Sequence, residues 1–268
     1  MKVPDTFCPD KNLDDKTEDL IQGAKIISNP CEETGLLFVQ RNYNLMGWHI
    51  DLKEPKPLLF SGSSINDLVI HENSIIYSVG KSVFREHEGL ITVFFYRAGP
   101  LASFNKDIYI VCGKDIYKNS DNEKVVSRET EVLDLFVFND RLYDLTVNKE
   151  KGKSYIHETL PNKKALILSN IFVHAASLEN KVYFSDETGC IYNGSTYIKT
   201  PSSYISSLAA GGDELFFSGT GLEGRILAFN PKNNKFRIAV ETGDLFDIRS
   251  IVPAHYSLIE ANRFSMRP

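Results

Sequence analysis

The sequence predicts an all-β protein built from repeated units of four short strands. Short runs of β-branched and aromatic residues, each typical of a strand, occur along the whole chain. Glycines at positions 47, 80, 113, 152, 189 and 224 precede similar segments, so the unit recurs after 33, 33, 39, 37 and 35 residues. No long stretch has the period of a helix, and only a short helical turn within 12–22 is expected.

The first and second strands of each unit are apolar runs that precede the recurring glycine. The second strands are rich in β-branched and aromatic residues, which predicts that they pack between neighbouring units. The smaller residues of the first strands suit the centre of a ring. First strands are predicted at 24–28, 66–71, 100–104, 133–138, 173–178 and 205–210. Second strands are predicted at 35–40, 74–79, 107–112, 141–146, 181–186 and 214–219.

The third strand of each unit begins just after the recurring glycine. We expect that glycine in a hairpin turn that requires a positive φ. A fourth strand follows, for example at 92–96, 164–168 and 236–240. Four short strands per repeat, in a chain almost without helix signals, predict a β-propeller in which each unit is one blade.

The number of blades depends on the last unit. Six complete units begin near positions 24, 65, 100, 132, 173 and 205. A seventh begins at 248–254, with a second strand expected at 257–264, so seven blades are preferred and six are the alternative. Because an open ring leaves an unpaired strand edge, we expect the N-terminal segment to close it, with residues within 3–22 completing the last blade. The chain, 1–268, is predicted to be a single propeller domain, and 1–22 is its acidic N-terminal segment.

Two segments carry a family resemblance. Residues 205–231, ISSLAAGGDELFFSGTGLEGRILAFNP, and residues 65–86, INDLVIHENSIIYSVGKSVFRE, resemble degenerate WD repeats. The Trp-Asp pair is missing, since the only tryptophan is Trp48, and so is the Gly-His pair. The hydrogen-bonded network of that family is therefore not carried over, and YWTD-like and lactonase-like propellers are about equally similar. The resemblance implies a rigid platform for other proteins, which is a fold-level analogy.

Gly219, Gly221 and Gly224 match the spacing of a dinucleotide-binding fingerprint, G-x-G-x-x-G. That fingerprint must open a helix whose N-terminus faces a pyrophosphate. Here the third glycine is followed by a strand-like run, RILAF, and then by an Asn-Pro turn. The sequence therefore predicts a hairpin and no nucleotide.

Aligning the units places one residue of each blade where its first strand enters the central channel. We favour a structural role for these residues, because Asp and Ser near strand starts commonly accept backbone hydrogen bonds. In the alternative, two carboxylates and an imidazole bind a metal or act as acid and base, which would make the chain a small hydrolase or metal-binding enzyme. No cofactor is predicted, since calcium takes about six to eight oxygen ligands and half of the ring supplies too few. The ring comprises Asp67, Pro100, Asp134, His174, Ser207 and Ser250.

Lysines are concentrated in the turns of one unit and could form a basic rim. Solvated hairpin tips are the simpler interpretation. The alternative is a rim that meets an acidic partner or RNA phosphates, as in a subunit of a ribonucleoprotein. The rim comprises Lys149, Lys151, Lys153, Lys163 and Lys164. A smaller group comprises Lys232, Lys235 and Arg237.

Composition limits the partners. The net charge of −5 and the pI near 5.7 argue against nucleic acid as the main ligand. The chain has no apolar run long enough to span a membrane, and its N-terminus is polar and acidic, so an intracellular protein of the cytoplasm or nucleus is expected. The four cysteines form no C-x-x-C pair and are expected to be free and mostly buried thiols.

The expected function is that of a non-catalytic protein-interaction scaffold, a WD-repeat-like subunit of a larger complex. No G-x-S-x-G, H-E-x-x-H or phosphate-binding loop occurs in the chain. Other proteins are the expected partners, with RNA as a minor contact. Binding is expected across the face formed by the loops between blades and the hairpins between second and third strands.

Overall fold

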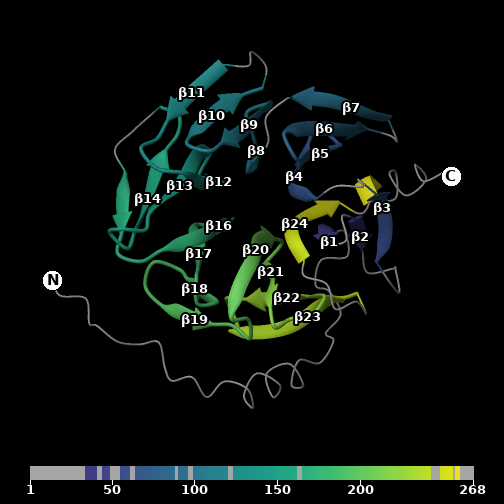
Figure 1. Ribbon diagram of the computed structural model, residues 1–268. Helices are drawn as coiled ribbons and strands as arrows, with labels where there is room; N and C mark the ends of the chain where they lie inside the picture. Colours follow the sequence, from purple (N-terminus) through teal and green to yellow (C-terminus); the bar gives the residue numbers. More distant parts are fainter. Residues whose placement is uncertain are drawn as a thin grey trace.

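The computed structural model is a ring of six four-stranded antiparallel sheets around a central axis (Figure 1). It describes residues 34–40, 44–48, 55–60, 64–87, 90–95, 99–119, 123–161, 165–242, 248–255 and 257–259. The all-β propeller prediction is confirmed. The preferred count of seven blades is wrong, because the described strands form six.

Each blade is one sheet, and its innermost strand faces the axis. Blade 1 comprises β24 (Ile248–His255), β1 (Thr34–Gln40), β2 (Asn44–Trp48) and β3 (Lys56–Phe60). Blade 2 comprises β4 (Ile65–His71), β5 (Ser74–Val79), β6 (Ser82–His87) and β7 (Leu90–Phe95). Blade 3 comprises β8 (Leu101–Phe104), β9 (Asp107–Cys112), β10 (Asp115–Lys118) and β11 (Glu123–Ser127).

The remaining three blades follow the same order from the axis outward. Blade 4 comprises β12 (Val132–Phe138), β13 (Arg141–Asn148), β14 (Lys153–Glu158) and β15 (Leu166–Leu168). Blade 5 comprises β16 (Phe172–Leu178), β17 (Lys181–Asp186), β18 (Cys190–Tyr192) and β19 (Tyr197–Lys199). Blade 6 comprises β20 (Tyr204–Gly211), β21 (Glu214–Thr220), β22 (Arg225–Asn230) and β23 (Lys235–Glu241).

The ring closes within blade 1, where the two ends of the described chain meet. Strand β24 pairs antiparallel with β1, so that Ile251 lies opposite Phe38 and His255 lies opposite Thr34. The segment that we expected to begin a seventh blade, 248–254, is therefore the inner strand of blade 1. The strand expected at 257–264 is not seen in its described part, since residues 257–259 are helical. The first strand expected at 24–28, the closing strand expected within 3–22 and the helical turn expected within 12–22 lie outside the described residues.

Five of the six recurring glycines lie in the predicted hairpin turns between second and third strands. Gly80 and Gly152, for example, have φ values of 57° and 60°. Gly47 differs, because it lies within β2 and a Cβ atom there would approach Ile259 Cγ2 to 2.8 Å and Leu58 Cδ1 to 2.9 Å. Close side-chain packing rather than a turn requires glycine at position 47.

Apolar side chains of neighbouring blades fill the spaces between the sheets, as the composition of the second strands predicted. Between blades 5 and 6, Tyr183 and Ile191 belong to one buried cluster with Phe217 and Phe229. Every residue of β5 except Val79 is buried. Six such clusters lie between the blades, and together they fix the relative positions of the inner strands around the axis.

Two further observations concern the described residues alone. None of their helices is long and apolar enough to cross a membrane. Cys112 and Cys190 are free thiols, and Cys190 is buried whereas Cys112 is exposed. Cys8 and Cys31 lie outside the described residues.

Candidate functional site

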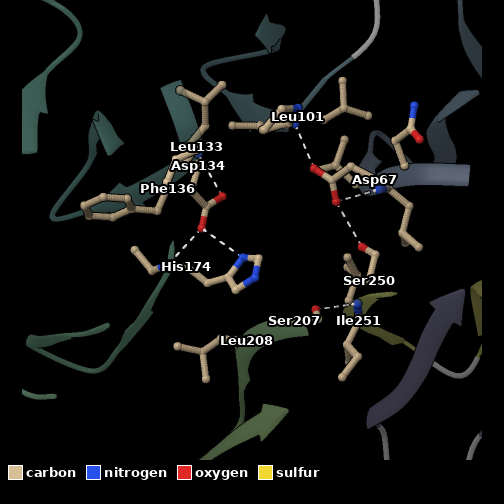
Figure 2. Close-up of a pocket in the computed structure, with 18 of the residues that line it drawn as sticks. Asp67, Leu101, Leu133, Asp134, Phe136, His174, Ser207, Leu208, Ser250 and Ile251 are labelled. Atoms are coloured by element: carbon tan, nitrogen blue, oxygen red, sulfur yellow. Dashed lines mark hydrogen bonds and ion pairs between the residues drawn. The ribbon is translucent and has the colours of Figure 1, made fainter. Parts of the chain in front are cut away.

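A cavity of about 640 Å³ lies at the hub of the propeller and is lined by residues from all six inner strands (Figure 2). The structure brings the aligned sequence positions together around it. The residues of this ring that line the cavity are Asp67, Pro100, Asp134, His174, Ser207 and Ser250.

A β-bulge immediately precedes the ring residue in five of the six inner strands. In β4 the register shifts between Ile65 and Asp67, and in β12 it shifts between Val132 and Asp134. The bulge inserts one extra residue and bends the strand. Sequence analysis missed these extra residues, because a bulged residue has no sequence signal of its own within an apolar run. They are Asn66, Leu133, Val173, Ser206 and Arg249.

Asp67 connects three blades through its carboxylate. Oδ1 accepts the backbone N–H of Leu68 at 2.9 Å, and Oδ2 accepts the backbone N–H of Leu101 in blade 3 at 2.9 Å. The Ser250 hydroxyl of blade 1 donates to Oδ1 at 2.9 Å. The carboxylate therefore satisfies backbone donors on the channel-facing edge of two inner strands.

The same arrangement recurs at every second blade interface. Asp134 accepts the N–H of Leu135 at 2.9 Å and that of Ala175, in the next blade, at 2.8 Å. Ser207 Oγ accepts the N–H of Ile251, in the next blade, at 3.0 Å. In these bonds three ring residues accept backbone hydrogen bonds, and the structural interpretation of the whole ring stays a prediction.

Burial changes the protonation of the ring. Burial raises the pKa of Asp67 to about 6 and that of Asp134 to about 8, and the nearby charge of Asp67 adds to the effect on Asp134. Burial lowers the pKa of His174 to about 4, so its imidazole is neutral at pH 7. The side chains of Asp134 and His174 keep 19% and 27% of their exposure, and that exposure faces the cavity (Figure 2).

His174 and Asp134 are the closest titratable pair of the ring, with 4.0 Å between Nδ1 and Oδ2. Among the residues that the structure describes, no group of three or more His, Cys, Asp or Glu side chains is arranged to hold a metal ion. The catalytic or metal-binding alternative for the ring stays a hypothesis.

Exposed residues line the cavity at the end where the inner strands begin, and we call this end its mouth. Asn66, Tyr204 and Arg249 line the cavity there and are exposed. Arg249 Nη1 donates to Ser64 Oγ at 2.9 Å, which bridges blade 1 to the start of blade 2. The hairpins between second and third strands border the same face, since Thr146 near the end of β13 pairs with Val132 at the start of β12.

Part of the expected basic rim is on this face. Lys149, Lys151 and Lys153 are exposed on the hairpin between β13 and β14. Lys163 and Lys164 lie outside the described residues. The hypothesis that the rim meets RNA or an acidic partner stays a hypothesis.

The smaller cationic group is largely neutralised. Arg237 is buried and its Nε donates to Glu214 at 2.9 Å. Lys232 forms ion pairs with Glu179 at 2.7 Å and with Asp213 at 3.2 Å. The charges of Arg237 and Lys232 are therefore paired with carboxylates of the same chain.

The glycine fingerprint lies in a hairpin and not at a helix start. Gly219 lies near the end of β21, Gly221 and Gly224 lie in the turn that follows, and β22 begins directly after Gly224. A dinucleotide site requires the start of a helix after these glycines, and here a strand begins instead.

Comparison with known proteins shows the fold. The sequence matches no protein-family model. It matches no curated protein sequence. A solved structure described as the crystal structure of a nidogen/laminin complex is similar, with a TM-score of 0.68 and 13% identity over 82% of this chain and 98% of that chain. At this identity the similarity shows the propeller fold alone, and membership of the WD-repeat family stays a hypothesis.

Proposed function

We propose that this propeller is a non-catalytic protein-interaction module that serves as a subunit of a larger complex. Its partners bind across the face where the central cavity opens. The observation that carries the proposal is the exposure of Tyr204 and Arg249 together at that mouth. Tyrosine and arginine are over-represented among the residues that contribute most to protein–protein binding.

Two further features support a binding face at this end. The loops between blades and the hairpins between second and third strands both border it, and such loops vary without disturbing a packed scaffold. The similar solved structure is described as a complex between two proteins, which supports a protein partner by analogy of fold. The backbone hydrogen bonds of Asp67 and Asp134 give these carboxylates a structural task that needs no reaction.

Site-specific photo-crosslinking tests the proposal. A benzophenone amino acid replaces Tyr204 in one variant and Lys106 in a matched control. Lys106 is exposed on the hairpin between β8 and β9, at the opposite face. We expect position 204, and not position 106, to crosslink to a defined protein in cells.

The captured protein must then bind the purified chain. We expect the double variant Tyr204→Ala, Arg249→Ala to weaken that affinity at least tenfold, and Lys106→Ala to leave it unchanged. Identical crosslinks from both faces, or unchanged affinity of the double variant, would contradict the proposal.

A further inference from the structure

The described residues that line the central cavity supply acceptors for hydrogen bonds but no buried cation to balance them. Of the described residues that line it, only Arg249 carries a permanent positive charge, and that residue is exposed at the mouth. Deeper in the cavity, Asp67 and Asp134 lie on strands of blades 2 and 4, and both carboxylates point into the cavity (Figure 2). Two carboxylates withdrawn from bulk water are stabilised by a cation between them.

Each of these groups can accept another hydrogen bond. A carboxylate has about four acceptor sites, and Asp134 uses one on each oxygen for the backbone of Leu135 and Ala175. His174 projects into the cavity from β16, and its Nδ1 lies 4.0 Å from Asp134 Oδ2, which is an ion-pair contact longer than a hydrogen bond (Figure 2). Because its imidazole is neutral at pH 7, one ring nitrogen is an acceptor.

The wall beside these acceptors is apolar. The apolar residues that line it include Val69, Leu133, Phe136, Leu208 and Val252. A ligand that suits both parts of the cavity therefore combines a hydrogen-bonding cation with a hydrocarbon chain.

We propose that the central cavity binds a primary alkylammonium group, which donates hydrogen bonds to Asp67, Asp134 and His174 while its alkyl chain contacts the apolar wall. An ammonium group has three N–H donors, which matches these three acceptors in number. A quaternary ammonium has none. The group can belong to a free alkylamine or to a lysine side chain, and the site goes beyond the proposed function because binding a free amine needs no partner protein.

Binding is coupled to proton release. The charged and titratable groups that line the cavity with Asp134 are Asp67 from β4, His174 from β16, Tyr204 from β20 and Arg249 from β24, whereas the lining residues of blade 3 are uncharged. Because burial raises the pKa of Asp134 to about 8, its carboxyl carries a proton at neutral pH that an ammonium ion displaces. We expect the release of roughly one proton per amine at pH 7 and about a tenth of a proton at pH 9.

Isothermal titration calorimetry with n-butylamine tests the proposal, in two buffers of different ionisation enthalpy so that proton release is measured. Butan-1-ol tests the need for charge, and butyltrimethylammonium tests the need for N–H donors. We expect saturable binding of butylamine, at least tenfold weaker binding of both analogues, and proton release that falls between pH 7 and pH 9.

Variants test the three acceptors. We expect Asp134→Asn to weaken butylamine binding about tenfold or more and to abolish the proton release. The control Asp140→Asn, on the exposed hairpin after β12, should bind as the wild type does. Should Asp134→Asn fail to fold, His174→Leu gives a second test, since the contact of His174 with Asp134 is longer than a hydrogen bond, and this variant should weaken binding severalfold.

A titration with the peptide Gly-Gly-Lys-Gly-Gly distinguishes the two sources of the ammonium group, a lysine side chain and a free alkylamine. Binding of the peptide with the same dependence on Asp134 identifies a lysine side chain as an acceptable ligand, and binding of butylamine alone identifies a free amine. Either result supports the proposal. No saturable binding of butylamine, equal binding of butan-1-ol, or wild-type binding by both Asp134→Asn and His174→Leu would overturn it.

Discussion

Asp67 and Asp134 each lie between two inner strands, and each of those strands presents one backbone N–H group. The two oxygens of a carboxylate accept both hydrogen bonds, which holds these side chains in position. Ser207 has a single hydroxyl oxygen and accepts one such hydrogen bond. The alignment of repeats placed these residues in one ring from sequence alone, because equivalent positions of equal units must lie at equal depth. Their shifted pKa values were not predictable, since they depend on how far each side chain is withdrawn from water.

The raised pKa of Asp134 predicts a loss of stability with rising pH. Its folded pKa of about 8 exceeds its ordinary value of 3.8, so the folded state binds the proton more tightly. Stability from this group is therefore highest below pH 4 and falls as pH rises through 8. Between pH 6.5 and 8.5 we expect the free energy of unfolding to fall by about 2 kcal/mol in the wild type.

That interval isolates Asp134 within the ring. The effect of Asp67 is complete once pH exceeds its folded pKa of about 6, and the opposite effect of His174 operates between about 4 and 6.5. Urea unfolding of wild type and Asp134→Asn at both pH values measures the difference. The same pH dependence in the two proteins would show that Asp134 is ionised throughout.

A second buried carboxylate, Asp144, joins blades 3 and 4 through an ion pair. Arg128 donates from Nε to Oδ2 at 2.8 Å and from Nη2 to Oδ1 at 2.6 Å, and Thr159 donates to Oδ1 at 2.8 Å. The side chain of Asp144 is fully buried. We expect Arg128→Met to lower the free energy of unfolding by about 3–5 kcal/mol, because it leaves a buried charge without its cation.

Removing both charges should cost less. The double variant Arg128→Met, Asp144→Leu has no uncompensated buried charge. We therefore expect its free energy of unfolding, measured in urea, to be higher than that of Arg128→Met alone. An equal or larger loss in the double variant would assign the effect of Arg128→Met to lost side-chain packing instead.

At the scale of the element, the repeated hairpins show which strand boundaries a sequence can predict. A glycine with positive φ recurs in five blades because other residues are strained there, so the turn before the third strand was predictable in those blades but was misplaced at Gly47. In blades 2, 3 and 4 the turn between first and second strands also has two residues with positive φ, as at Asn139 and Asp140, which matches a type I′ hairpin. Sequence analysis did not use that signal, because Asn and Asp also occur in ordinary loops.

Gly47 and Gly80 should tolerate substitution differently. A Cβ at Gly80 meets nothing within 4 Å, but φ is 57°, so Gly80→Ala should cost about 1–2 kcal/mol and Gly80→Asn less. Gly47→Ala should cost about 1–3 kcal/mol by displacing Leu58 and Ile259, and Gly47→Asn should cost more than alanine. Thermal unfolding of the four variants measures this reversal, and the same order of alanine and asparagine at both sites would contradict it.

At the scale of the whole molecule, counting first strands overestimated the number of blades. Because the ring closes by pairing the last strand, β24, with β1, an inner strand follows the fifth blade that is complete along the chain. In the sequence that strand looks like the start of another blade, because the pairing partner of β24 lies more than two hundred residues away. Local patterns therefore identified most of the described strands but not the closure.

Removing β24 should open the ring. Deletion of residues 248–268 takes away the inner strand of blade 1 and leaves the edge of β1 unpaired. It also removes four large apolar side chains that are at most 8% exposed, those of Ile248, Ile251, Leu258 and Ile259. Their burial contributes roughly 6–12 kcal/mol as an upper estimate, comparable to the whole stability of a typical domain. We expect the truncated chain to aggregate or to lose cooperative unfolding.

The missing strand should act in trans if pairing with β1 is what closes the ring. A synthetic peptide of residues 245–262 can add to the exposed edge by β-augmentation, and its apolar side chains can refill the cores beside blade 1. We expect it to restore solubility and a cooperative thermal transition that sharpens with peptide concentration. The same peptide with Ile251→Asp places a charge where Ile251 is 3% exposed and should not restore them. Rescue by both peptides would mean that backbone pairing alone closes the ring, and a cooperative truncated chain without peptide would refute closure through β24.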